Sequence, residues 1–464
     1  MILFLMACSG APAPETSADA PPTAAPAAAA TPAPRTARNL VIVTLDTTRA
    51  DHLEIYGYPR PTSPALALFG QQSIVFDAAY APTSTTLPAH WSLFTGVYPF
   101  EHGLLDNMGV VDDGQVFIAN PEVSSLVEVA QAQGFQTAAF VSSVALKRHT
   151  GVDRGFQTFD EPAGTTRVAP ETVERALSWL EGAQAPFLLW VHFIDPHWPY
   201  APPEHFSAMF HADASVEAML QSRGAVLSIS QIHQVGAGGG ETTQARTVDL
   251  IDAYDAEIRL MDSQLARLFS GLQKQGLWHD TAVVIAGDHG ESLGQHRALS
   301  HGDIHGEQLR VPLMVAIPGA APRRVAEAVS LVDVAAMTLP QVAGDWSGFL
   351  ASGRGRDVLS AAIQGPVYAQ RTEHPFGATW AWSMVEEGWK VVVEPDTDRV
   401  QLFNLMDDPH ELNDRAAGEP ERLAEMRARL LTEFDRQRAS YTPTQGGALD
   451  GATREQLEAL GYIH

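Results

Sequence analysis

The chain has 464 residues, of which 45% are hydrophobic and 18% charged. This composition is typical of a globular protein, and the length favours one large domain with a smaller one. The 30 basic and 55 acidic residues give a net charge of −25, a field that repels nucleic acid and offers anionic membranes no basic patch. We therefore expect no nucleic-acid partner, and an anionic substrate needs cations at its site that reverse the local field.

The first 37 residues indicate a leader and a tether. Cys8, the only cysteine, follows a short apolar stretch, which resembles a lipoprotein signal peptide, although a chance cysteine is the alternative. Residues 9–37 are rich in Ala, Pro, Thr and Ser, a composition that cannot bury a core and favours a linker. We expect residues 1–8 to be a signal remnant. The protein would then lie in the cell envelope or periplasm, held at the membrane only by a lipid on Cys8.

Four apolar runs after residue 38 predict strands that are buried on both faces of a parallel sheet. These runs are Asn39–Leu45, Thr137–Val141, Phe187–Ile194 and Ala282–Ala286. Helical patterns separate them, at residues 123–133, 170–181 and 248–272. The alternation predicts an α/β fold with a doubly wound, mostly parallel central sheet flanked by helices.

Three of these runs end in acidic or histidine residues. The first ends at Asp46, the third in Asp195-Pro196-His197, and the fourth in Gly287-Asp288-His289. In open α/β sheets, ligands bind beyond the carboxyl ends of the strands. We therefore expect the three segments to deliver side chains to one site.

The remaining chain divides into shorter parts. We assign residues 38–320 to the catalytic domain and 321–436 to a smaller C-terminal α+β subdomain, with short strands at Trp389–Val393 and Val400–Leu405. The tail, 437–464, has a break at 441–451 and then a short helix, Thr453–Leu460. Within the catalytic domain, residues 206–246 form an insertion, either a flexible lid or an inert surface loop, and the loop is favoured.

A short helix is predicted over residues 88–95, since Pro88 suits its first turn and Gly96 the position past its end. Thr86 then lies at the helix N-terminus, where free N–H groups and the dipole favour negative charge. A hydroxyl there loses its proton more easily and can act as a nucleophile. On spacing alone, the simpler interpretation is that Thr85 or Thr86 only caps the helix.

The stretch from Thr86 to Pro99 resembles the signature of the sulfatases. Asp46–Leu53, Asp195–Tyr200, Gly287–Glu291 and Phe403–Glu411 also resemble family motifs, and they occur in the family's order. The resemblance covers residues 38 to 430 and indicates the sulfatase-like branch of the alkaline phosphatase superfamily.

Three residues depart from the sulfatase pattern. Thr86 stands where sulfatases have the Cys or Ser that becomes formylglycine, and threonine cannot yield that aldehyde. His90 stands in place of an arginine, and Thr47 in place of the second acidic ligand. A threonine at the position of the nucleophile instead resembles the phosphodiesterases and the phosphoglycerol or phosphoethanolamine transferases of the same superfamily.

The resemblance implies that Asp46, Thr86, Asp288 and His289 surround one divalent metal. Two carboxylates and an imidazole suit zinc or manganese, whereas an all-oxygen set would suit calcium or magnesium. A metal beside the Thr86 hydroxyl lowers the pKa of that hydroxyl. The alternative for Asp288 and His289 is a turn at a strand end with a surface histidine.

Further residues are assigned by the same resemblance. Asp195, His197 and His301 either hold a second metal or contact the anion, and Asn107 is either a phosphate ligand or a loop residue. His305 is close in sequence and could take the place of His301, although we favour the interpretation that it is a solvent-exposed loop histidine. We expect Arg49 and Glu291 to brace the loops beside Asp46 and Asp288.

Together these features predict a metal-dependent hydrolase of sulfate or phosphate esters, leaning to phosphate mono- or diesters, with a small-molecule, glycan or lipid substrate. Thr86 would attack the phosphorus or sulfur, His197, His301 or a second metal would assist the leaving alkoxide, and water would then release the covalent Thr86 ester. Two alternatives stay open. One is an envelope transferase in which an alcohol replaces that water, and the other is a degenerate protein that binds its ligand without turnover.

Overall fold

The computed structural model describes residues 36–107, 115–212, 214–227, 246–360, 363, 365–371, 380–448 and 451–459. The predicted signal remnant with Cys8, all but the last two residues of the linker, and the glycine-rich stretch 236–240 lie outside these residues. Within the described part of the chain, none of the helices is both long and apolar enough to cross a membrane.

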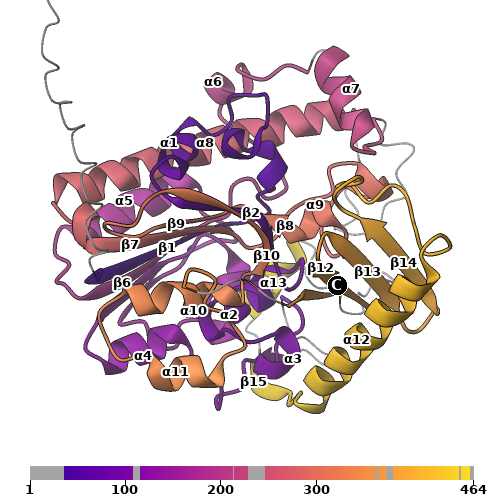
Figure 1. Cartoon of the computed structure of the whole chain (residues 1–464). Helices are drawn as coiled ribbons and strands as arrows, with labels where there is room; N and C mark the ends of the chain where they lie inside the picture. The colour runs from indigo at the N-terminus through magenta and orange to yellow at the C-terminus, as the bar shows by residue number, and fades with distance from the viewer. Residues whose placement is uncertain are drawn as a thin grey trace, which may run out of the picture. The chain divides into compact units, whose positions relative to one another are not determined.

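A nine-stranded, mostly parallel sheet forms the centre of the fold (Figure 1). Its strands run in the order β10-β2-β9-β7-β1-β6-β4-β5, and β8 pairs with the last two residues of β2, Ala79 and Tyr80. Strand β9 is antiparallel to both of its neighbours. The strands are β1 (Asn39–Leu45), β2 (Ile74–Tyr80), β4 (Gln136–Phe140), β5 (Thr158–Asp160), β6 (Phe187–Phe193), β7 (Thr281–Gly287), β8 (Arg310–Val311), β9 (Leu313–Ala316) and β10 (Arg323–Ser330). All four predicted strands are present, and the predicted fold class is confirmed.

Helices cover both faces of this sheet (Figure 1). One face packs on α1 (Pro64–Gly70), α5 (Ala169–Leu180) and α8 (Thr247–Lys274), and the other on α2 (Thr86–Thr95), α4 (Leu126–Ala132) and α10 (Asp333–Thr338). Side chains of β1 alternate between the two cores, since Leu40 and Ile42 join one cluster and Val41 and Val43 the other. This two-sided burial explains why the strands are almost continuously apolar.

The C-terminal subdomain is a four-stranded antiparallel sheet in the order β11-β12-β13-β14. Its strands are β11 (Val367–Arg371), β12 (Ala381–Glu386), β13 (Trp389–Glu394) and β14 (Arg399–Asn404), and α12 (Pro420–Ala439) packs across it. Strand β10 lies in the large sheet, parallel to β2, so the large sheet continues past residue 320.

The C-terminal tail contains a strand that the sequence did not predict. Strand β15 (Thr444–Ala448) lies in the predicted break and pairs with β3 (Gln115–Ile118), more than 300 residues earlier in the chain. The last helix, α13 (Gly451–Ala459), matches the predicted one. Helix α6 (Glu204–Ser207) overlaps the start of the predicted insertion, and α7 (Ala214–Ser222) lies within it.

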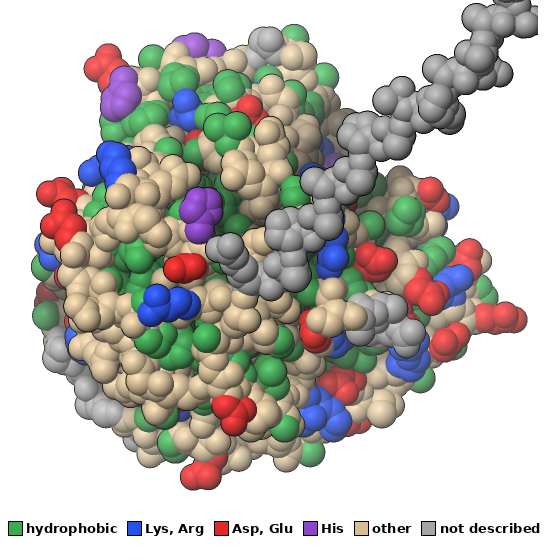
Figure 2. Space-filling model, turned by 60° about the vertical axis from the view of Figure 1, so that its left-hand side comes forward, with side chains coloured by type: hydrophobic (Ala, Val, Ile, Leu, Met, Phe, Trp, Pro, Cys, Tyr) green, Lys and Arg blue, Asp and Glu red, His purple; other side chains and the backbone are tan. Residues whose placement is uncertain are grey.

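On the face shown in Figure 2, acidic and basic side chains are interspersed, and hydrophobic side chains are scattered among polar ones. This face therefore presents no continuous patch of a single charge.

We predict that Phe434→Ala weakens the subdomain. Phe434 is 1% exposed and stacks on Trp382 with 4.6 Å between ring centroids, which fixes α12 on the sheet. Losing a buried aromatic ring should lower the free energy of unfolding by about 3–5 kcal/mol, measured by urea denaturation. Leu68→Ala, at a side chain that is 61% exposed, should change the free energy of unfolding by less than about 0.5 kcal/mol. Equal losses in the two variants would contradict this packing.

Candidate active site

The candidate site lies at the carboxyl ends of three adjacent parallel strands. Leu45, the last residue of β1, pairs with Phe193 of β6 on one side and with Gly287 of β7 on the other. Asp46 and Asp288 follow directly, so their buried side chains meet at this edge. The sheet topology alone brings together residues that are more than 240 positions apart.

Helix α2 presents Thr86 to the same edge. Thr86 is the first residue of the helix and is fully buried, with Oγ1 3.2 Å from Nε2 of His289. Thr85 occupies the N-cap position, although its side chain makes no capping hydrogen bond. The Thr86 hydroxyl therefore faces the strand ends rather than capping its own helix.

Asp46, Asp288 and His289 form a cluster whose ligand atoms all lie within 4.8 Å of one another. Nε2 of His289 is 3.8 Å from Oδ1 of Asp46 and 3.7 Å from Oδ2 of Asp288. Among the described residues, no group donates a hydrogen bond to either Asp46 oxygen or to Oδ2 of Asp288. Buried anions without donors are costly, and a cation between them would remove that cost.

The tautomer of the His289 ring also suits metal binding. Nδ1 of His289 lies 3.0 Å from the carbonyl oxygen of Gly290. A carbonyl only accepts, so Nδ1 carries the proton and Nε2 keeps the lone pair that a metal needs. The donor set of two carboxylates, an imidazole and the Thr86 hydroxyl therefore fits a divalent metal.

Burial sets the charges in this cluster. Burial raises the pKa of Asp46, and burial together with the charge of Asp46 raises the pKa of Asp288 well above its usual value. Burial also lowers the pKa of His289, and the neighbouring His301 lowers it further. Without a cation the site resists carrying both carboxylate charges at once.

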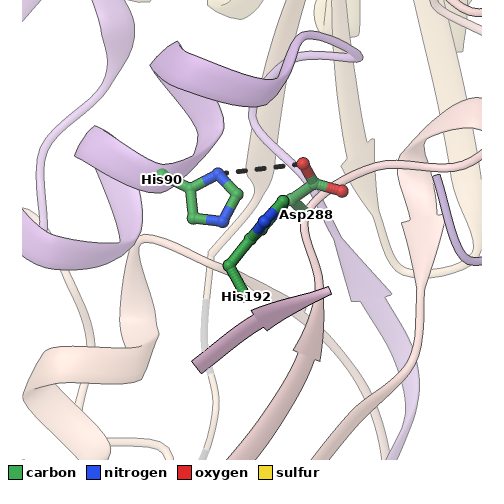
Figure 3. Close-up of side chains that lie close together, drawn as sticks. All are labelled: His90, His192 and Asp288. Carbon is green, nitrogen blue, oxygen red and sulfur yellow. Dashed lines mark ion pairs between the residues drawn. The ribbon is translucent and has the colours of Figure 1, made fainter. Parts of the chain in front are cut away.

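His90 supports the cluster. Its Nδ1 donates to the carbonyl of Thr86 at 2.7 Å, and its Nε2 accepts from the hydroxyl of Thr44 at 2.9 Å. Thr44 in turn accepts from the indole N–H of Trp190, which leaves its own proton for His90. Burial lowers the pKa of His90 to about 3, so the ring is neutral. Although Nδ1 lies 3.7 Å from Asp288 (Figure 3), both ring nitrogens are already used.

His192 is a functional candidate that sequence reasoning missed. Its Nδ1 accepts from the backbone N–H of Ser142 at 3.3 Å, so in the neutral ring Nε2 carries the proton. Nε2 lies 3.3 Å from Oδ2 of Asp46 but makes no hydrogen bond to it, so His192 lines the cluster without donating to it. Burial lowers the pKa of His192 to about 3. The available signal was a histidine inside the apolar run of β6.

The structure brings His301 and His197 beside the cluster. The His301 ring lies 4.5 Å from that of His289 and 5.3 Å from that of His197, measured between centroids. Burial opposes a charge on His301, but the Glu291 carboxylate, 3.4 Å from Nδ1, outweighs burial and raises its pKa. Burial lowers the pKa of His197, whose Nδ1 donates to the carbonyl of Trp198 at 2.5 Å. His301 is therefore the better candidate for a cationic acid.

Asp195 and Asn107 make local contacts. Oδ2 of Asp195 accepts from the N–H of Ala169 at the start of α5, and burial raises the pKa of Asp195 to about 6. Asp195 does not belong to the metal-ligand groups found among the described residues. Oδ1 of Asn107 accepts from the N–H of Leu87, directly after Thr86, at 2.8 Å.

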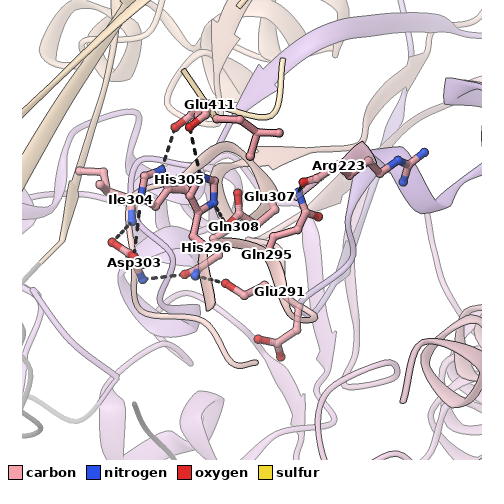
Figure 4. Close-up of polar contacts among 12 residues, drawn as sticks. Arg223, Glu291, Gln295, His296, Asp303, Ile304, His305, Glu307, Gln308 and Glu411 are labelled. Carbon is pink, nitrogen blue, oxygen red and sulfur yellow. Dashed lines mark hydrogen bonds and ion pairs between the residues drawn. The ribbon is translucent and has the colours of Figure 1, made fainter. Parts of the chain in front are cut away.

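The loop beside Asp288 is held by charged side chains (Figure 4). The Arg49 guanidinium donates to the carbonyls of Glu291 and Ser292, as expected of a bracing residue. The prediction that His305 is solvent-exposed is wrong, because this residue is buried and its Nδ1 lies 3.0 Å from Oε2 of Glu411. Glu411 lies 106 residues downstream, so the local sequence held no signal for this contact.

Comparison with known protein families identifies the class to which this chain belongs. The sequence model of the family described as Sulfatase matches residues 38–344, and the chain therefore belongs to the sulfatase family. Members of this family and its structural neighbours include arylsulfatases and a phosphonate monoester hydrolase, which are ester hydrolases. Family membership confirms the sulfatase part of the resemblance.

Several curated proteins are similar in sequence. Arylsulfatase K of Xenopus laevis is 29% identical over 206 residues, which cover 42% of this chain and 38% of that protein. The multifunctional alkaline phosphatase superfamily protein PehA of Trinickia caryophylli is 26% identical over 159 residues, 31% of each chain. The matched segments thus span less than half the length of these relatives. Arylsulfatase K of Mus musculus is 24% identical over 85% of this chain and 80% of its own.

Solved structures share the fold. A phosphonate monoester hydrolase of Agrobacterium radiobacter superposes with a TM-score of 0.67 at 19% identity, covering 88% of this chain and 96% of that one. A 2-O GAG sulfatase superposes with a TM-score of 0.71 at 17% identity, covering 90% and 96%.

We predict that Asp288→Asn removes the thermal stabilisation by zinc, since the variant loses a carboxylate of the cluster. A ligand at 100 times its Kd stabilises by about 2.7 kcal/mol, and this gain should vanish. Because the folded-state pKa of Asp288 lies above the unfolded one, the metal-free wild type loses stability as pH rises above about 4. The metal-free variant lacks this loss. The melting temperature of the variant minus that of the wild type, both without metal, should therefore increase from pH 5 to pH 8.

Asp262→Asn is the matched control. Asp262 is also buried, and it accepts hydrogen bonds from Ala65 and Leu66 at the start of α1. Its variant should keep the zinc-induced rise in melting temperature. A full zinc response in Asp288→Asn would show that the metal lies elsewhere.

Proposed function

We propose that this sulfatase-family chain is a metal-dependent ester hydrolase that uses Thr86 as its nucleophile and prefers phosphate mono- or diesters. The observation that carries the proposal is the position of the Thr86 hydroxyl. It is buried at the start of α2, 3.2 Å from His289, beside two carboxylates of which three oxygens lack a hydrogen-bond donor among the described residues. A sulfatase that works through formylglycine needs an aldehyde at this position, and threonine cannot supply it.

Asp46, Asp288, His289 and Thr86 would hold the metal. Oxygen and nitrogen donors in this ratio suit zinc or manganese better than calcium or magnesium. When bound, a divalent metal lowers the pKa of a neighbouring hydroxyl and neutralises charge on the ester oxygens.

The chain's own residues then account for a two-step displacement. Oγ1 of Thr86, after losing its proton to solvent, attacks the phosphorus, and the bond from phosphorus to the ester oxygen breaks. The departing oxygen takes the electron pair and a proton from the His301 imidazolium, which leaves a Thr86 phosphoester. Neutral His301 then accepts a proton from water as the water attacks the phosphorus. Thr86 leaves, regains a proton and releases the phosphate product.

Relatives and neighbours indicate the breadth of substrates to test. Their names include an ulvan-active sulfatase of Formosa agariphila and a 2-O GAG sulfatase. Glycan esters therefore stand beside small-molecule and lipid esters as candidate substrates for this chain.

We predict that Thr86→Ala lowers kcat/KM by about 10³-fold or more, because a nucleophile's removal leaves only binding and electrostatic assistance. Thr86→Ser should keep activity within about tenfold, since it retains the hydroxyl. The assay compares aryl sulfate, aryl phosphate and diaryl phosphate, each with zinc, manganese and calcium. Thr85→Ala, one residue away at the N-cap, is the matched control and should stay near wild type.

The outcomes separate the alternatives. Equal activity in wild type and Thr86→Ala would remove the nucleophile assignment, and a preference for aryl sulfate would overturn the choice of phosphate. Turnover that appears only after an acceptor alcohol is added would indicate a transferase.

We predict that the effect of His301→Ala on the reaction rate depends on the leaving group. An alkyl alcohol needs a proton as it departs, so the rate of alcohol release in the first turnover should fall by on the order of 10²–10⁴ for an alkyl phosphate. A p-nitrophenolate leaves without protonation, so the rate of its release in the first turnover should fall far less, while the second step, which also uses His301, slows equally for both esters. His279→Ala, at an exposed histidine, controls for the loss of an imidazole. Equal losses in the first-turnover rate for both leaving groups would contradict the role of His301 as acid.

A further inference from the structure

The segment 291–305, here called the His301 loop, folds back on itself beside the proposed metal site. Its two arms are joined by backbone hydrogen bonds from Ser292 to Ser300, from Leu293 to Leu299 and from Gly294 to Ala298, at 3.3, 3.2 and 2.7 Å. The loop carries His301 and is held at its start by Arg49. Its other end is held by the C-terminal subdomain.

Lys390 of β13 reaches this second end. Its Nζ donates to the carbonyl oxygen of Ile304 at 2.6 Å and to both carboxylate oxygens of Glu411 at 2.7 and 2.8 Å. All three ammonium hydrogens are thereby used. Lys390 is 0% exposed and Glu411 is 3% exposed, so this ion pair is enclosed between the subdomain and the loop.

Glu411 makes further contacts with the loop (Figure 4). Its Oε2 lies 3.0 Å from Nδ1 of His305, and its backbone carbonyl lies 3.2 Å from Nε2 of His296. Gly306 allows this approach, since a Cβ there would come within 2.8 Å of a Glu411 oxygen. One residue of the subdomain therefore contacts the loop at its turn, through His296, and at its end, through His305.

His296 and His305 complete the junction. Nδ1 of His296 lies 2.8 Å from Oε1 of Glu307, while Nε2 faces the Glu411 carbonyl. Both partners only accept, so His296 donates from both nitrogens and is an imidazolium. Its ring stacks on that of His305, with centroids 3.7 Å apart and planes at 4°. Two cations and two carboxylates thus interlock the loop with the subdomain.

The same loop also contacts the nucleophile segment. The hydroxyl of Ser84, two residues before Thr86, donates to the carbonyl of Asp303 at 2.6 Å. A shift of the loop would therefore change the positions of both His301 and the start of α2. A misplacement of about 1 Å can lower a rate about 10²-fold.

A buried ion pair is weak support for stability, because replacing both partners by apolar residues is often neutral. The pair is better explained by the geometry that it imposes. We propose that Lys390 and Glu411 are positioning residues, which hold the His301 loop where His301 meets the metal-site His289 and the reacting ester. This inference rests on the proposed function for its catalytic part.

The test replaces the pair without leaving an unpaired charge, as Lys390→Met/Glu411→Leu in the full chain. The amides of Leu293 and Gly294 should exchange hydrogen about tenfold faster, and inorganic phosphate should bind the zinc-loaded protein about tenfold more weakly. We expect kcat for aryl phosphate to fall about 10- to 100-fold, while zinc affinity stays within about threefold. Lys390→Arg, which keeps the charge and several donors, should retain most of the activity.

Glu386→Leu/Arg429→Met is the matched control. This pair joins β12 to α12 in the same subdomain, with Nη2 of Arg429 2.7 Å from Glu386, and within the described part of the chain its hydrogen bonds and ion pairs stay in β12 and α12. It should leave exchange, phosphate binding and kcat unchanged. If the first double variant does not fold, Lys390→Gln/Glu411→Gln, which keeps polar groups without charge, is measured instead and should show the same three losses.

Two results are distinguishable. A folded variant with wild-type exchange, phosphate binding and kcat would overturn the positioning role. A wild-type protein that hydrolyses none of the three aryl esters would overturn the proposed function, and the exchange and phosphate-binding measurements would still decide whether Lys390 and Glu411 hold the loop.

Discussion

The meeting of two buried carboxylates at adjacent strand ends is the constraint on which this site depends. Asp46 and Asp288 lie at the carboxyl edge of β1 and β7, and three of their four oxygens lack a hydrogen-bond donor among the described residues. In most protein interiors, buried carboxylates accept hydrogen bonds or lose their charge. The described part of the surrounding chain supplies no donor to these three oxygens, and it adds the Nε2 lone pair of His289 and the hydroxyl of Thr86. A cation at the centre of this arrangement would remove the cost of burying both carboxylate charges.

The neighbouring histidines are consistent with that constraint because burial keeps them neutral. His90 donates a hydrogen bond to the Thr86 carbonyl and His192 lies beside the Asp46 carboxylate, and neither ring adds charge. His301 differs, since Glu291 raises its pKa. The site therefore separates its roles by environment. Fully enclosed rings hold geometry, and the ring paired with a carboxylate is suited to carry a proton.

The sequence predicted the part of the site that topology controls. Asp46, Asp288 and His289 follow apolar runs, and parallel strands end at one edge, so their proximity needed no further information. His192 was missed because it lies within such a run. The prediction that His305 is exposed was wrong because its partner, Glu411, is distant in sequence. Strand β15 escaped prediction since its residues are Gly-rich and its pairing with β3 spans more than 300 positions. Contacts across such separations follow from tertiary packing, which local patterns do not encode.

The replacement of arginine by His90 is coherent with a threonine nucleophile. An arginine at this buried position would place a permanent cation beside Asp288, where Nδ1 of His90 now lies 3.7 Å from the carboxylate. That cation would share the charge of Asp288 with a bound metal, because guanidinium groups bind carboxylates in a bidentate manner. A neutral imidazole would leave the charge of Asp288 to the metal. Under the proposed function a metal held in this way would lower the pKa of the Thr86 hydroxyl, so the two departures from the sulfatase pattern would act in the same direction.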